Sequence, residues 1–207
     1  MQKMNTTLLV AVLACVLVSC GGSHFRMKTT HLQKAAANTP IRDTLVIVAV
    51  DDHEIRSLFE NYFKKRLTAE GVKAIPSIAE RSLQEGTKLK KQAIVDVADK
   101  HGNDSVLFTR LVGFNDTEAF SRDLPQAYRD LGDFDKYAWG YIHWPTTYSD
   151  TVTLTIETRL YDVATESLIW TGESRLTNPE TRGKAIGQVV DGVIKELAKN
   201  GLLPDQS

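Results

Sequence analysis

The sequence has almost no cysteine. The chain of 207 residues contains two, Cys15 and Cys20, and none follows position 20. A folded domain built from the later residues therefore has no disulfide, no thiol nucleophile and no cysteine-ligated metal.

Common catalytic and metal-binding motifs are also missing. The sequence contains no GxSxG, Walker or GxGxxG pattern. Its five histidines show neither HxH nor HExxH spacing, which argues against a zinc site. We therefore expect no metal, no cofactor and no enzymatic activity.

Neither sign of charge is in excess. The formal net charge is −1, and basic residues are interspersed with acidic ones without forming a basic stripe. This pattern argues against a nucleic-acid partner. The chain is 42% apolar and 25% charged, which is typical of a soluble globular domain.

No apolar run is long enough to span a bilayer. Residues 8–18 form a run of eleven apolar residues, whereas a transmembrane helix needs about 20. Lys3 precedes this run. The pattern predicts a secretory signal peptide over residues 1–19.

The signal segment ends in Leu-Val-Ser-Cys-Gly at residues 17–21. This stretch resembles the lipobox of bacterial lipoproteins, and the alternative is an ordinary secretory signal with a chance cysteine near the cut. The resemblance implies that Cys20 begins the mature chain and carries acyl chains, palmitate among them, which anchor it to a membrane. Gly21, not Asp, follows the lipid site. By resemblance to sorting in enteric bacteria, this favours the outer membrane, facing the periplasm, over the inner membrane.

Residues 20–42 are polar, small and aperiodic. They predict a lipidated cysteine followed by a flexible tether with a mean span of about 25 Å. Arg26, Lys28 and Lys34 could contact anionic headgroups, although a solvated linker is the simpler interpretation.

The patterning of a folded domain covers residues 43–203, and residues 204–207 form a tail. Residues 44–50 read as a strand buried on both faces, and an apolar stripe at helical spacing then runs over residues 55–67 and ends at Gly71. A short strand over 72–77, a helix over 89–101 and a strand over 105–112 follow. Two successive strand-helix-strand units predict parallel strands.

The second half of the domain has a different pattern. Residues 151–161 alternate between apolar and polar side chains and return through a turn to residues 168–174, which predicts an antiparallel hairpin. Asn178, before Pro179, is the expected N-cap of a last helix that ends at Gly201. The prediction is a single α/β domain with a mixed parallel and antiparallel sheet of about five strands backed by helices, in the order β-α-β-α-β-β-β-α.

Several junctions carry a family resemblance. They are residues 69–77 (AEGVKAIPS), 101–110 (HGNDSVLFTR), 160–170 (LYDVATESLIW) and 178–180 (NPE). Together they resemble small, largely uncharacterised bacterial envelope lipoproteins. More distantly, the fold resembles curli-secretion lipoproteins, lipoprotein activators of peptidoglycan synthases and the N-terminal domain of the Tol translocation protein. The resemblance implies an interaction or assembly protein and supplies no active site.

The densest polar cluster is Asp51, Asp52, His53 and Glu54, where a predicted strand meets a predicted helix. Open α/β sheets often bind ligands at such a place. An envelope hydrolase or a small-ligand-binding protein using this edge is therefore the alternative function. Helix capping by Asp52 is the simpler interpretation.

The most distinctive segment is the long insertion at residues 115–150. Nine of the chain's aromatic residues lie between positions 114 and 148, interleaved with aspartates and without regular period. Tyr and Trp suit recognition surfaces because they offer a large contact area with few rotatable bonds. The candidate partner-binding residues are Tyr137, Trp139, Tyr141, Trp144 and Tyr148. The alternative is a loop that folds over the sheet and buries its own rings. The favoured function is a non-catalytic envelope lipoprotein that binds another envelope protein, or itself, through these residues and the adjoining hairpin face.

Overall fold

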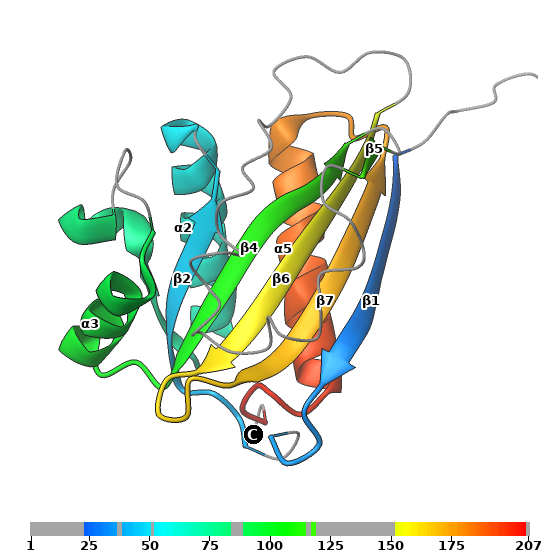
Figure 1. Ribbon diagram of the computed structural model, residues 1–207. Helices are drawn as coiled ribbons and strands as arrows, with labels where there is room; N and C mark the ends of the chain where they lie inside the picture. Colours follow the sequence, from blue (N-terminus) through cyan, green and yellow to red (C-terminus); the bar gives the residue numbers. More distant parts are fainter. Residues whose placement is uncertain are drawn as a thin grey trace, which may run out of the picture.

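The chain folds as a single mixed α/β domain built on an open sheet (Figure 1). This computed structural model describes residues 23–36, 39–50, 52–83, 89–114, 117–118 and 152–205. The strands are β1 (His24–Leu32), β2 (Asp43–Ala49), β3 (Lys73–Pro76), β4 (Ser105–Phe114), β5 (Thr117–Glu118), β6 (Thr153–Asp162) and β7 (Leu168–Thr177). The helices are α2 (His53–Ala69), α3 (Lys91–His101) and α5 (Arg182–Lys199), with two short 3-10 turns, η1 (Ser77–Ala79) and η2 (Arg81–Leu83).

The sheet has the strand order β1-β7-β6-β4-β2-β3, and β5 pairs with the end of β4. β2 runs parallel to both β3 and β4, whereas β4, β6, β7 and β1 pair antiparallel. The predicted fold class, the parallel half and the antiparallel hairpin are therefore confirmed. Pro76 lies in the edge strand β3, where its missing N–H costs no ladder bond.

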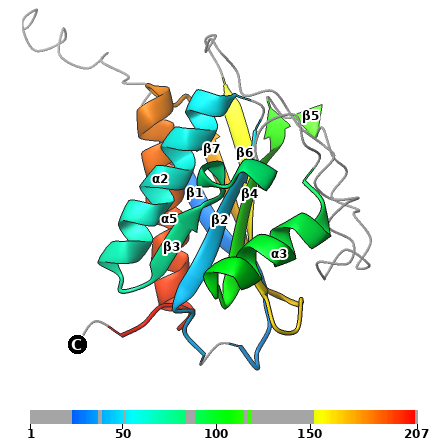
Figure 2. The ribbon, with the colours of Figure 1, turned by 90° about the vertical axis from the view of Figure 1, so that its left-hand side faces the viewer.

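Helices cover both faces of the sheet, but unequally (Figure 2). α2 and α5 lie over one face and enclose the main apolar core with residues from β2, β4, β6 and β7. α3 lies over the other face, where a second core joins it to β2 and β4. The continuous apolar run of β2 follows from this arrangement, because its side chains are buried on both sides.

The helix ends show which local predictions hold. Asp52 caps α2, since its Oδ1 accepts hydrogen bonds from the N–H groups of Glu54 at 2.9 Å and Ile55 at 3.1 Å. Gly71 and Gly102 follow α2 and α3 with φ of +79° and +67°, which glycine adopts without a Cβ clash.

The prediction that Asn178 caps the last helix is wrong. Asn178 has a φ of +50°, and its Oδ1 accepts a hydrogen bond from the N–H of Val152 at 2.9 Å. It therefore joins the end of β7 to the start of β6. Thr181 caps α5 instead, because its Oγ1 accepts from the N–H of Lys184 at 3.2 Å.

The predicted flexible tether over residues 20–42 is wrong for His24–Leu32, which form the edge strand β1. Phe25 and Met27 pack against the main core on the α5 side. Thr29 Oγ1 donates to Glu196 Oε2 at 2.8 Å and accepts from Trp170 Nε1 at 3.1 Å. This strand is tied to α5 and β7 by side chains that lie more than 140 positions away in the sequence.

The start of β1, the end of β4, the start of β6 and the end of β7 all lie at one end of the sheet. His24 faces Thr177, Thr153 faces Thr177, and Phe114 faces Leu154. We call this the upper end, because it lies at the top of Figure 1, where α5 also begins. β1 therefore starts at the same end of the sheet at which the chain leaves β4 for residues 115–151 and returns into β6.

No helix within the described part of the chain is long and apolar enough to cross a membrane. Cys20 and the predicted signal peptide lie outside the described residues, so lipidation stays a prediction.

Candidate functional site

The Asp51–Glu54 cluster behaves as a helix start. Asp52 is engaged in capping, and His53 and Glu54 are exposed; Asp51 lies outside the described residues. Within the ranges that the structure describes, no three His, Cys, Asp or Glu side chains gather closely enough to hold a metal. The capping interpretation of Asp52 is therefore confirmed.

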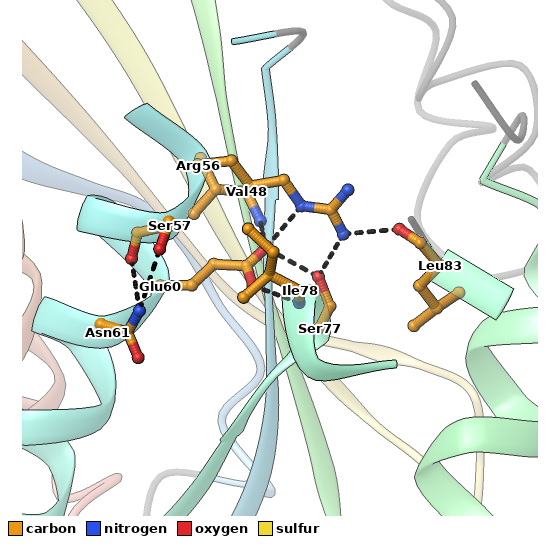
Figure 3. Close-up of polar contacts among 8 residues, drawn as sticks. All are labelled: Val48, Arg56, Ser57, Glu60, Asn61, Ser77, Ile78 and Leu83. Atoms are coloured by element: carbon orange, nitrogen blue, oxygen red, sulfur yellow. Dashed lines mark hydrogen bonds and ion pairs between the residues drawn. The ribbon is translucent and has the colours of Figure 1, made fainter. Parts of the chain in front are cut away.

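A buried ion pair that the sequence did not indicate lies one turn further along α2 (Figure 3). Arg56 and Glu60 are 6% and 0% exposed, and Arg56 Nε donates to Glu60 Oε1 at 3.0 Å. Glu60 Oε1 also accepts from the N–H of Val48 at 3.0 Å and from Ser77 Oγ at 2.7 Å. Its Oε2 accepts from the N–H of Ile78 at 2.7 Å.

Arg56 completes the cluster on its other side. Its Nη2 donates to Ser77 Oγ at 2.7 Å and to the backbone oxygen of Leu83 at 2.6 Å. The pair thus joins α2 to β2, η1 and η2. A carboxylate with four protein donors and no solvent exposure is suited to holding a fold together, not to binding a substrate.

The candidate interaction surface is the side of β4, β6, β7 and β1 opposite α5, which we call the open face. On this side of the sheet α3 packs over β2 and the first half of β4. No described helix lies over the rest of the open face (Figures 1 and 2). The charged side chains of the open face are Arg26, Lys28, Arg110, Glu157, Arg159, Glu173 and Arg175. The alternation along residues 151–161 predicts that Glu157 and Arg159 point to the opposite side of β6 from Leu154, Ile156 and Leu160, as they do.

The centre of the open face is an Arg-Glu-Arg group. Glu157 Oε1 lies 3.2 Å from Arg159 Nε and 3.8 Å from Arg110 Nε. Arg159 Nη1 donates to the hydroxyl of Tyr161 at 3.5 Å. Arg110 and Arg159 are 3% and 7% exposed. Burial raises the pKa of the Tyr161 hydroxyl above its ordinary value, and the positive charge of Arg159 opposes this shift.

The candidate partner-binding residues Tyr137, Trp139, Tyr141, Trp144 and Tyr148 lie outside the described residues. The structure does place the two ends of their segment. Phe114 of β4 and Leu154 of β6 are paired at the upper end of the sheet. The segment that carries the aromatic residues is therefore attached next to the hairpin whose face was predicted to bind a partner together with it.

Comparison with known proteins gives structural matches only. No protein-family model and no curated protein sequence matches the chain. It is similar to two dodecamer structures of PelC from Paraburkholderia phytofirmans, one of them a point variant, at 12% and 10% identity. Each has a TM-score of 0.42 and covers 88% of this chain and 100% of PelC. It is also similar to lipoprotein GNA1162 from Neisseria meningitidis at 14% identity, with a TM-score of 0.41, over 76% of this chain and 99% of that one. Because TM-scores below 0.5 do not establish a shared fold, we derive the function from the residues of this chain.

A cavity of about 390 Å³ opens at the opposite, lower end of the sheet, between residues 33–41 and the β6–β7 turn. Its carboxylates already serve the backbone: Asp104 Oδ2 accepts from the N–H of Arg42 at 2.8 Å, and Asp162 Oδ1 accepts from the N–H of Thr165 at 2.7 Å. Both carboxylates therefore stabilise the backbone of the neighbouring loops.

An ion-pair group formed by Glu80, Lys100 and His101 makes the stability of the domain depend on pH. Glu80 accepts from Lys100 Nζ at 2.9 Å, and its Oε1 lies 2.6 Å from His101 Nε2. Hydrogen bonds from Lys100 and then His101 hold the pKa of Glu80 below its ordinary value of 4.5. A depressed carboxyl pKa stabilises the fold above the unfolded-state pKa, and this contribution is lost as the pH falls through the folded-state value.

We therefore expect Glu80→Gln to destabilise the domain by less than about 1 kcal/mol at pH 7. The difference from wild type should shrink to nothing as the pH falls below the lowered pKa of Glu80. Urea unfolding of both proteins at pH 7, 5 and 3 measures it. A difference that is as large at pH 3 as at pH 7 would contradict this account of Glu80.

Proposed function

We propose that the protein is a non-catalytic binding or assembly module of the bacterial cell envelope, held by acyl chains on Cys20 and facing the periplasm. It contacts another envelope protein, or further copies of itself, through Tyr137, Trp139, Tyr141, Trp144 and Tyr148 together with the adjoining open face. The outer membrane is the favoured membrane.

The observation that carries this proposal is the distance along the chain between the predicted lipid site and the folded domain. β1 begins at His24, four residues after Cys20. Four residues reach at most about 14 Å when fully extended. An anchor this short keeps the upper end of the sheet beside the membrane, and residues 115–151 leave and re-enter the sheet at that same end.

The chemistry of the described residues supports binding over catalysis. The buried charged pair of Arg56 and Glu60 is engaged in structural hydrogen bonds. The open face instead offers the exposed side chains of Arg26, Lys28 and Arg175 on a rigid antiparallel sheet, next to a segment rich in Tyr and Trp. Rigid aromatic side chains bordered by charged residues are typical of protein recognition surfaces.

The test is site-specific photo-crosslinking in the native envelope. Crosslinkers at Tyr137 and Trp144 should trap one or a few defined protein species, and Lys64, an exposed residue of α2, serves as the control position. Replacing Tyr137, Trp139, Tyr141 and Trp144 by Ser should abolish the trapped species while the domain keeps its circular dichroism spectrum. Failure to trap any protein, together with an unchanged phenotype of the folded Ser variant, would contradict the proposal.

Acylation of Cys20 is tested separately. Cys20→Ala should release the protein from the membrane fraction and remove the acyl mass from its N-terminal peptide. Dissociation of a chain held by two or more acyl groups is negligible, so the change in membrane partition should be close to complete. A Cys20→Ala variant that remains in the membrane fraction would contradict lipidation at this residue.

A further inference from the structure

Basic side chains collect where β1 begins. Arg26 on β1 and Arg175 on β7 are direct cross-strand neighbours, and both are exposed on the open face. His24 and Lys28 flank Arg26 on the same side of β1. We call His24, Arg26, Lys28 and Arg175 the upper basic strip.

The pairing of Arg26 with Arg175 places two positively charged side chains directly opposite each other. Like charges directly opposite each other in an antiparallel pair destabilise the sheet, because their Cβ atoms lie about 5 Å apart. One row further, Lys28 faces Glu173 and pairs with it at 2.9 Å. Arg26 Nε donates to His24 Nε2 at 2.8 Å, so its neighbour within β1 is a base and not a carboxylate. A facing pair of arginines at this position suits an anionic ligand.

The position of the strip indicates which ligand. His24 lies four residues after the predicted acylated cysteine, so the strip begins within about 14 Å of the lipid anchor and continues along a rigid strand. The strand cannot swing freely, because Phe25 and Met27 pack on the core and Thr29 bonds Glu196 on α5. The nearest anionic groups to such an anchor are the phosphates of the membrane itself.

We propose that the upper basic strip binds the phosphate groups of the membrane surface that holds the anchor, so that the domain stands with its upper end on the bilayer. This proposal rests on acylation of Cys20. Each Lys or Arg near an anionic surface contributes about a fivefold increase in binding, and attachment through a short linker gives an effective concentration in the millimolar range. Weak individual contacts are therefore enough to fix the orientation.

The test measures which end of the acylated, full mature chain lies near the headgroups. A fluorophore is placed on a single introduced cysteine, either Gly183→Cys at the start of α5 or Ala164→Cys in the β6–β7 turn. An added Cβ at Gly183 meets no atom within 4 Å, and Ala164 is exposed, so both variants should fold. Quenching by a headgroup spin-labelled lipid, which acts at close range, is compared in phosphatidylglycerol-containing and in purely phosphatidylcholine vesicles.

In anionic vesicles we expect strong quenching at position 183 and little at position 164, since about 30 Å of strand separates the two ends. Arg26→Gln with Arg175→Gln should lower the equilibrium constant for the oriented state about 25-fold, at about fivefold for each side chain. The matched control is Lys65→Gln with Lys195→Gln, which removes the same charge from exposed positions on α2 and α5 and should leave the quenching unchanged.

Two results would overturn the proposal. One is equal quenching at position 183 in neutral and anionic vesicles, which would leave the strip to another acidic occupant, such as the acidic residues within 115–150 of this chain. The other is an Arg26/Arg175 variant that behaves as the lysine control does. If Cys20 is not acylated, the protein does not float with vesicles of either kind, so failure of the anchor is distinguishable from failure of the strip.

Discussion

Replacing Glu60 by alanine is expected to lower the free energy of unfolding by about 3–5 kcal/mol, because it leaves the buried guanidinium of Arg56 without its carboxylate. The same change removes the acceptor of the N–H groups of Val48 and Ile78 and of the Ser77 hydroxyl. Urea unfolding followed by circular dichroism measures the loss.

The control lies one residue away. Asn61 is exposed on the same helix, and its Nδ2 donates only to Ser57 (Figure 3). Asn61→Ala should change stability by no more than about 0.5 kcal/mol. The double change Arg56→Met with Glu60→Leu should be less harmful than Glu60→Ala, because it buries no unpaired charge. A loss below about 1 kcal/mol for Glu60→Ala would contradict the role assigned to the cluster.

Replacing Gly192 by alanine is expected to destabilise the domain by about 1–3 kcal/mol and to loosen β1 selectively. A Cβ at Gly192 would lie 2.4 Å from Cζ and 2.7 Å from Cε1 of Phe25, which packs from β1 onto α5 at this point. The ring must move, and the edge strand moves with it. Hydrogen exchange over residues 24–32 measures the loosening.

Gly187 provides the matched control on the same helix. A Cβ there lies 3.9 Å from the Tyr62 hydroxyl, which is an ordinary contact. Gly187→Ala should therefore be neutral or stabilising by up to about 1 kcal/mol, from the helix preference of alanine. Phe25→Ala should cost less in the Gly192→Ala background than in wild type, because the two side chains compete for one space. Additive effects, or fast exchange along β1 already in the wild type, would contradict the docking of β1 on α5.

The elements that the sequence predicted are those whose signal is local. The run of residues 44–50 is apolar throughout because β2 is buried on both faces. Asp52 and Gly71 act within one turn of α2, so their roles can be read from neighbouring residues. The parallel half of the sheet follows from the alternation of these elements.

The elements that the sequence missed depend on distant partners. Over residues 24–29 of β1, only Phe25 and Met27 make the inner face apolar, and the third inward residue, Thr29, is held by Trp170 and Glu196. Such a strand resembles a polar linker until the rest of the sheet is in place. Asn178 fits the pattern of a helix cap, but its bond to Val152 across the sheet takes precedence.

The buried cluster was missed for a similar reason. Arg56 and Glu60 are spaced as an ordinary exposed ion pair of a helix, four residues apart. Their burial depends on Ser77 and Leu83, which lie 17 or more positions further along the chain. An Arg and a Glu on the strand-facing side of an amphipathic helix are the only local signal.

Because residues 24–32 form β1, the link between the predicted lipid site and the folded domain is much shorter than the sequence predicts. A 22-residue coil would let the domain explore the space above the membrane, whereas acylation of Cys20 would leave a link of three residues before β1 and hold the start of β1 within about 14 Å of the anchor.

Hydrogen exchange with mass spectrometry on the mature protein extracted from its membrane tests this account most directly, because one peptide reports both features. The account predicts that the peptide covering residues 20–32 carries the acyl mass on Cys20 and that the β1 amides facing β7 are protected from exchange, while those on the free edge of the strand exchange fast. A peptide without acyl mass, or one whose residues 24–32 exchange at the rate of an unstructured chain, would contradict it.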